Sequence, residues 1–222
     1  MYSDIFCRHT EGLALKNDKE TREKLLASAK QEFLEKGYMQ ASLRNICKNA
    51  GVTTGALYFF FQDKEDLFAS IVYEPLSMLQ QFMSSHYQEE TNMTIPSMES
   101  FEDFGDDLEV ARQALRFMYR YYDEFELVLN KSQGSKFEHC VDKFVEITEN
   151  HYRYMGDKIA EKMQTEKFDD YMIHWVAHTQ IQTFVHILTH EKNEEEGIRH
   201  LEPIIQYLIA GWMGMFTQGR KR

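Results

Sequence analysis

Two pairs of histidines have the spacing of metal ligands. His174 and His178, and likewise His186 and His190, stand four residues apart, so a helix would place each pair on one face. Such pairs bind zinc when a third ligand completes the site and a carboxylate supports it. No third ligand at a diagnostic spacing accompanies either pair, and we therefore expect no bound metal.

Four common catalytic motifs do not occur in the chain. It contains no HExxH, no GxSxG, no phosphate-binding glycine loop and no carboxylate pair at a recognisable catalytic spacing. The three cysteines, Cys7, Cys47 and Cys140, are widely separated and form no CxxC site. We expect neither catalysis nor a cofactor. An all-α enzyme, or a protein-interaction module, remains the alternative class.

The composition is that of a soluble globular protein. Of the 222 residues 43% are hydrophobic and 27% are charged, and the presence of only 3 prolines favours long helices. No signal peptide is visible. The most apolar run, 204–216, is shorter than the roughly 20 residues that a membrane helix needs. We therefore expect a cytoplasmic protein that does not enter the membrane.

Acidic charge is confined to the later part of the chain. The formal net charge is −11, yet residues 1–72 hold ten basic and ten acidic residues. The whole acidic excess therefore lies in residues 73–222. Only the first part could approach a polyanion without strong repulsion, although a solvated acidic surface on a single domain would show the same asymmetry.

Hydrophobic periodicity predicts an all-α fold of about nine helices. Propensity alone would make 57–61 a strand, but Gly51, Thr53 and Asp63 supply the stops and caps of a short helix. We expect a flexible arm at 1–17, a smaller unit at 18–72 and a larger unit at 73–222. The helices are expected at 18–36, 42–50, 53–61, 64–87, 106–122, 124–129, 137–163, 168–189 and 194–216.

Two short helices joined by Ala50-Gly51-Val52 form a helix-turn-helix pattern. Glycine suits the turn because the chain must reverse there through a left-handed backbone conformation. The second helix would face a DNA major groove with four side chains: Thr53, Thr54, Ala56 and Phe59.

Residues 21–68 resemble the tetracycline-repressor (TetR) family of bacterial one-component regulators. The anchors of this resemblance are Ala29, Phe33, Gly37-Tyr38, Ser42, Ile46, Ala50-Gly51-Val52, Gly55, Leu57-Tyr58, Phe61, Lys64 and Leu67. The resemblance implies phosphate contacts from Ser42, Tyr58 and Lys64, and base contacts from Arg44, Thr53, Thr54 and Ala56. Two positions depart from the family pattern. Thr54 replaces a long polar group, and the pair Phe59-Phe60 replaces the usual His/Tyr pair.

The remaining helices are expected to form a homodimer interface and a pocket. An apolar stripe along 194–216 is wide enough for more than one neighbour, although packing within one chain could also cover it. A two-fold dimer would match a palindromic operator. Aromatic and polar side chains on apolar faces are candidate contacts for a small, largely apolar or aromatic effector: Phe117, Tyr121, Phe125, Phe144, His151, Trp175, His178 and Gln182. The sequence thus predicts a dimeric repressor that binds double-stranded operator DNA and is released from it by a small-molecule effector.

Overall fold

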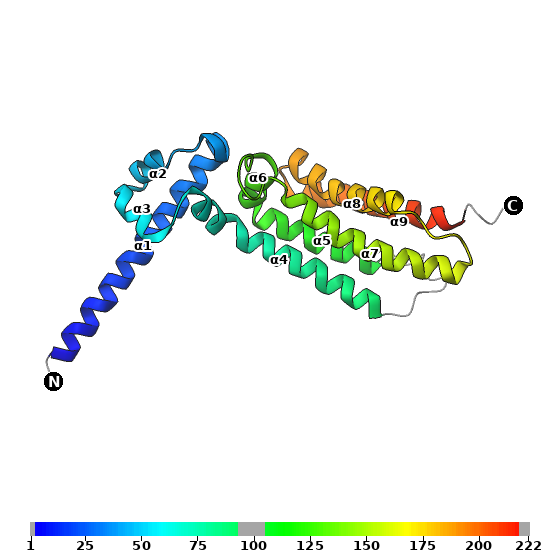
Figure 1. Ribbon diagram of the computed structural model, residues 1–222, viewed down its shortest axis with the longest axis horizontal. Helices are drawn as coiled ribbons and strands as arrows, with labels where there is room; N and C mark the ends of the chain where they lie inside the picture. The colour runs from blue at the N-terminus through cyan, green and yellow to red at the C-terminus, as the bar shows by residue number, and fades with distance from the viewer. Residues whose placement is uncertain (1–2, 93–104, 218–222) are drawn as a thin grey trace. The chain divides into compact units, whose positions relative to one another are not determined.

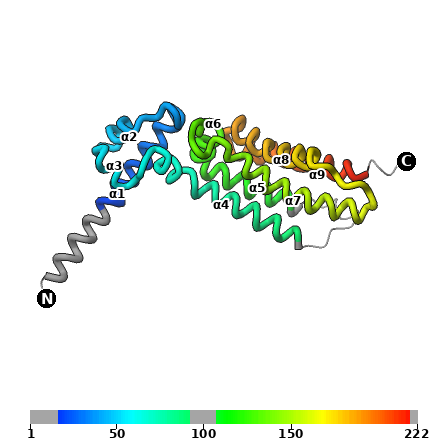
Figure 2. The backbone as a smooth tube through the Cα atoms, viewed as in Figure 1, coloured from blue at the N-terminus to red at the C-terminus, as the bar shows by residue number. Residues whose placement is uncertain are grey.

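The computed structural model describes the backbone of residues 3–92 and 105–217 (Figure 1). It describes the side chains of residues 17–91 and 107–217, the part of the chain that is coloured in the tube of Figure 2. Within these ranges all regular elements are helices, which confirms the all-α prediction (Figure 1). The helices are α1 (Ser3–Gln40), α2 (Leu43–Ala50), α3 (Thr54–Phe60), α4 (Lys64–Asn92), α5 (Gly105–Arg120), α6 (Tyr122–Asn130), α7 (Cys140–Met163), α8 (Asp170–His190) and α9 (Glu194–Thr217).

The first helix starts earlier in the chain than the sequence predicted. It begins at Ser3 rather than at Asp18, so the arm expected at 1–17 is helical from Ser3 onward. No proline interrupts this stretch, and Leu13, Ala14 and Leu15 are good helix formers, which outweighs the missing apolar periodicity. At the other end, Gly37 leaves the helical conformation with φ 72° and ψ 163°, close to the expected stop.

The chain forms two compact units. The first contains Met1–Glu74 together with Asp123–Glu138, and the second contains Pro75–Tyr122 together with His139–Arg222. We had expected α6 to belong with the later helices. It joins the first unit because the Tyr38 backbone N–H donates to the Lys131 carbonyl over 2.7 Å, and the Lys30 ammonium lies 3.0 Å from Glu124 Oε1.

An aromatic cluster forms the core of the first unit. The Phe33 and Phe68 rings meet edge to face with centroids 5.0 Å apart, and both side chains are fully buried. Apolar side chains from α1 to α4 complete this core: Leu25, Ala29, Ile46, Leu57, Phe61 and Leu67. The two short helices are thus held against α1 by burial, since neither is long enough to be stable alone.

In the second unit, α5, α7, α8 and α9 pack side by side (Figure 1). Helix α9 contributes to two apolar clusters, with Leu201 and Ile205 in one and Trp212 and Phe216 in the other. Most of the α9 stripe is therefore covered within this chain, which was the alternative to a dimer surface. Helix α4 continues through Pro75 without ending there. No helix in the described ranges is long and apolar enough to cross a bilayer.

Candidate nucleic-acid interface

Helix α3 has one buried face and one exposed face. Leu57 and Phe61, at its centre and end, are buried, whereas 57% of Tyr58 and 73% of Phe59 are accessible. The two exposed aromatic side chains thus lie on the surface that the sequence assigned to DNA. Phe61 belongs to the core, and the Arg22 guanidinium lies over its ring, 5.4 Å from the centroid.

Thr53 caps α3 and remains exposed. Its hydroxyl accepts a hydrogen bond of 3.2 Å from the Ala56 backbone N–H, which leaves the hydroxyl proton available to another acceptor. Thr54 is exposed beside it, and Ala56 is half-buried. The predicted base-contacting residues of α3 therefore lie together at the start of the helix.

Ser42 caps α2, and its backbone N–H is hydrogen-bonded to the buried carboxylate of Glu32. The Ser42 hydroxyl accepts a hydrogen bond from Asn45 N over 3.4 Å, and the Ser42 backbone N–H donates to Glu32 Oε1 over 3.1 Å. Arg44, in the first turn of α2, is exposed to solvent. The Ser42 cap and the Glu32 carboxylate that binds its backbone N–H therefore fix the start of the helix that carries Arg44.

Lys64, a predicted phosphate contact, also has a structural role. Its ammonium donates to the carbonyl oxygens of Met39 and Ala41, each over 3.1 Å, and lies 4.7 Å from the centroid of the Tyr38 ring. Burial lowers the pKa of this ammonium. Because an ammonium has three N–H donors, one donor remains for a phosphate oxygen. The two carbonyl groups thus stabilise the Lys64 ammonium within the chain itself.

Lys48 was not predicted from the sequence. It is exposed and follows Arg44 by four residues, so the two cations share a face of α2. That spacing was visible in the sequence, but the surrounding residues did not show that the face is exposed.

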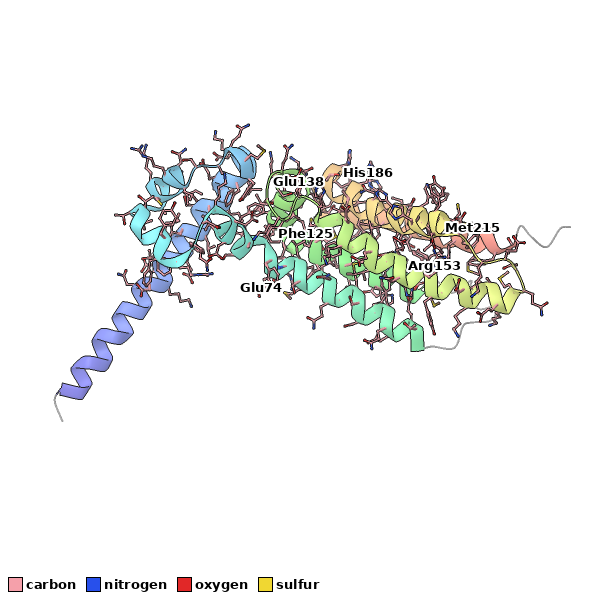
Figure 3. All side chains as sticks on the ribbon, in the orientation of Figure 1. Glu74, Phe125, Glu138, Arg153, His186 and Met215 are labelled. Atoms are coloured by element: carbon pink, nitrogen blue, oxygen red, sulfur yellow. The ribbon has the colours of Figure 1, made fainter. Side chains whose placement is uncertain are left out.

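The predicted effector contacts are only partly brought together. Phe117 and Tyr121 pack on each other in the second unit, with ring centroids 4.9 Å apart. Phe125 is buried on α6 in the first unit (Figure 3). A burial pattern alone could not reveal that α6 changes unit.

Phe144 and His151 lie on α7 with different surroundings. Phe144 packs against the buried cluster of Val145, Ala177 and Ile181. His151 stacks on Tyr87 with ring centroids 4.0 Å apart, and its Nε2 lies 2.8 Å from Glu90 Oε2. His151 is therefore bound into a polar cluster rather than left without a partner in an apolar wall.

Trp175, His178 and Gln182 lie on the exposed side of α8. The structure does not bring them together with Phe144 inside the chain, because the buried stripe of α8 consists of its aliphatic residues Ile173, Val176, Ala177, Ile181, Ile187 and Leu188. A shallow depression at the start of α9 contains none of the predicted effector contacts. It is lined by Arg116, Asn193, Glu194, Glu195 and Ile198.

The exposed side of α8 also carries the two histidine pairs. His174 Nδ1 lies 3.1 Å from Glu149 Oε2, and the His186 and His190 rings stack at 4.0 Å (His186 is labelled in Figure 3). Among the described residues, neither pair belongs to a group of three potential metal ligands.

The exposed face of α3, the capped α2 and the glycine turn between them define a helix-turn-helix DNA-binding protein. Residues 25–71 match the family model described as "Bacterial regulatory proteins, tetR family". The chain is 55% identical over 53 residues to the HTH-type transcriptional repressor BepR of Brucella suis, a match covering 24% of this chain and 25% of BepR. It is 48% identical over 52 residues to the HTH-type transcriptional regulator AcrR of Shigella flexneri, covering 23% of this chain and 24% of AcrR.

The whole fold is also similar to a solved structure. NalD, the secondary repressor of the MexAB-OprM multidrug efflux pump in Pseudomonas aeruginosa, superimposes with a TM-score of 0.55 at 21% identity, over 86% of this chain and 96% of NalD. The matches to BepR and AcrR span about a quarter of those proteins. Residues 25–71 therefore have the sequence and the fold of a TetR-family helix-turn-helix DNA-binding domain.

Proposed function

We propose that this protein is a dimeric repressor that binds a palindromic operator and is released from it by a small-molecule effector. The observation that carries the DNA part is the outward face of α3, where Tyr58 and Phe59 are exposed while Leu57 is buried. An apolar side chain such as Phe59 can contact the methyl group of thymine, and Arg44 can read guanine O6 and N7. Repression is the function named for BepR and NalD.

Within this proposal, Ser42, Tyr58, Lys64 and Lys48 contact phosphates. Ser42 stands at a helix N-terminus, where the free N–H groups of the first turn attract anions. Lys48 adds a cation on the same side of α2 as Arg44. The near-neutral charge of residues 1–72 requires these few cations to provide most of the attraction to DNA.

A second copy of this chain is the proposed partner of α8 and α9. Three large aromatic side chains on these helices stay exposed: Tyr171, Trp175 and Tyr207 are accessible by 71%, 51% and 73%. On α9, Gly211 and Gly214 have no atom within 4 Å of where a Cβ would lie, so another helix could approach closely there. A two-fold dimer would present two copies of α3 to successive major grooves about 34–36 Å apart.

The proposed effector site lies in the second unit, around Phe117, Tyr121, Phe144 and His151. Aromatic rings dominate this set, which favours a largely apolar or aromatic molecule. Effector and operator would oppose each other by linkage, so that operator DNA weakens effector binding by the same factor by which effector weakens operator binding.

Selection from a random duplex library with the purified full chain, at two salt concentrations, tests the proposal. We expect enrichment of a two-fold-symmetric site, with affinity falling as salt rises. Enrichment of an asymmetric site would contradict the dimer. Weak binding without any sequence preference would contradict the proposal that the protein binds a specific operator, and would favour a protein-interaction module.

A further inference from the structure

Three helices of the second unit bring two histidines and two carboxylates together. His86 and Glu90 come from α4, Asp107 from α5 and His151 from α7. His86 Nε2 lies 3.3 Å from Glu90 Oε1, and His151 Nε2 lies 2.8 Å from Glu90 Oε2. His86, Glu90 and Asp107 each offer one ligand atom, and these three atoms lie within 4.8 Å of one another.

Packing restricts the inner part of this cluster. The side chains of His86 and Glu90 are each 21% accessible, and that of His151 is 12% accessible. The Tyr87 ring lies parallel to His151, with a 7° angle between the planes, and the Tyr87 hydroxyl is 3.3 Å from Thr148 Oγ1. The His151 ring and the carboxylate it contacts are therefore held in one orientation.

The cluster provides two carboxylates beside an imidazole. The Glu90 carboxylate contacts both His86 and His151, one with each oxygen. Asp107 is exposed and adds a second carboxylate, whose ligand atom lies within 4.8 Å of those of His86 and Glu90. Carboxylate and imidazole together suit divalent transition metals better than Mg²⁺ or Ca²⁺, which prefer oxygen ligands alone.

The distances fit such an ion after a small movement. Zinc lies about 2.0–2.2 Å from its nitrogen and oxygen ligands, so two tetrahedral ligand atoms are separated by about 3.3 Å. The His86 and Glu90 atoms already have this separation. Asp107, being exposed, needs to approach by at most roughly 1.5 Å, which a side-chain rotation can supply.

We propose that His86 Nε2, Glu90 Oε1 and a carboxylate oxygen of Asp107 bind a divalent transition-metal ion. His151 is then a positioning residue, because it contacts the second oxygen of Glu90 and fixes the direction of the first. Three protein ligands leave one tetrahedral position open for water or another small ligand. The sequence signal was the four-residue spacing of His86 and Glu90, which the histidine pairs on α8 obscured.

Titration of the metal-free full chain, without an affinity tag, tests this site. Co²⁺ would be followed by its visible absorption and Zn²⁺ by competition with Co²⁺. We expect one site per chain and at least a tenfold loss of affinity in His86→Gln and in Asp107→Asn. His151→Phe, which keeps an aromatic ring against Tyr87, should weaken binding by about 10–100-fold. His178→Gln and His190→Gln are the matched controls and should bind as the unmodified chain does.

Folding and metal binding can be separated in the same variants. Asp107 is exposed, so Asp107→Asn should keep the circular dichroism spectrum and the melting temperature of the metal-free protein. Zn²⁺ should raise the melting temperature of the unmodified chain but not that of this variant. Unchanged affinity in Asp107→Asn and His86→Gln, or loss of binding in the two controls instead, would overturn the proposal. The outcome does not depend on whether the chain binds DNA.

Discussion

The buried carboxylate of Glu32 accepts a hydrogen bond of 3.1 Å from the backbone N–H of Ser42. Only 5% of Glu32 is accessible, and the same oxygen is 3.4 Å from Asn45 Nδ2. This contact joins the later part of α1 to the start of α2. The acidic side chain also lies at a helix N-terminus, where the helix dipole favours negative charge.

Glu32→Ala should lower the free energy of unfolding by about 1–3 kcal/mol, because the Ser42 N–H and the Asn45 amide lose their shared acceptor in a buried place. Urea denaturation measures the loss. Glu32→Gln keeps one acceptor oxygen and should lose less. Glu35→Ala, at an exposed position three residues further along α1, is the control and should change stability by less than about 0.5 kcal/mol. Equal effects at both positions would contradict a specific role for the contact.

Gly51→Ala should destabilise the turn between α2 and α3 by about 1–2 kcal/mol. Gly51 has φ 69°, in the left-handed region that disfavours a Cβ, although no atom lies within 4 Å of where that Cβ would be. The cost is therefore backbone strain rather than a clash. Gly55→Ala is the matched control. It lies inside α3 with ordinary backbone angles, so we expect it to be neutral or stabilising by up to about 1 kcal/mol. Thermal denaturation compares the two variants. A greater loss of stability in Gly55→Ala than in Gly51→Ala would contradict backbone strain as the cost at Gly51.

Arg44→Ala should cost about 1–3 kcal/mol in operator affinity, concentrated at one base pair. Fluorescence anisotropy with the selected operator and its single-base variants, at fixed salt, measures this pattern. A uniform loss across all sequences would make Arg44 a phosphate contact instead. Lys64→Gln should show that uniform loss together with lower stability, because Lys64 also binds the Met39 and Ala41 carbonyl oxygens.

Tyr207→Glu and Trp175→Glu should each convert the proposed dimer to a monomer. Burying a carboxylate in an apolar contact is costly, and both side chains are exposed in the single chain, so folding should be little affected. Sedimentation equilibrium should show the dimer dissociation constant raised by more than tenfold. Tyr73→Glu replaces an equally exposed aromatic outside α8 and α9 and should leave the dimer intact. If all three variants behave alike, α8 and α9 are not the interface.

Cys140 should react slowly with iodoacetamide at neutral pH. Burial, with the charge of Asp142, raises the pKa of this thiol from the usual 9.0 to about 11. The reactive thiolate is therefore scarce in the folded chain until the pH approaches 11. The unfolded chain gives up this proton nearer pH 9, so the contribution of Cys140 to stability falls as pH rises between these values. Peptide mapping of alkylated protein follows Cys140 separately from the other cysteines. A midpoint near pH 9 in the folded chain would contradict the burial.

The local sequence was sufficient to predict much of the secondary structure of the first unit. Ser42 and Thr53 cap the helices predicted to follow them, and Gly51 adopts the positive φ expected of the turn. These features depend on neighbours within a few residues, because caps and turns are satisfied by nearby backbone groups. The same short range explains why 57–61, which has strand propensity, was predicted as a helix: residues 57–60 lie in α3, and Phe61 is its C-cap.

Long-range packing decided the rest. The assignment of α6 to the first unit follows from contacts of Lys131 and Glu124 with α1, about ninety residues earlier in the chain, which no periodicity contains. Trp175, His178 and Gln182 interrupt the apolar pattern of α8, and only the packing shows that they lie outside the core. The carboxylates and histidines around Glu90 come from three helices, so their meeting is a property of the tertiary structure. The sequence was enough to predict most helices, their caps and the helix-turn-helix segment, because these depend on local backbone energetics. Tertiary structure alone decided which polar side chains are buried together, because burial is set by segments distant in sequence.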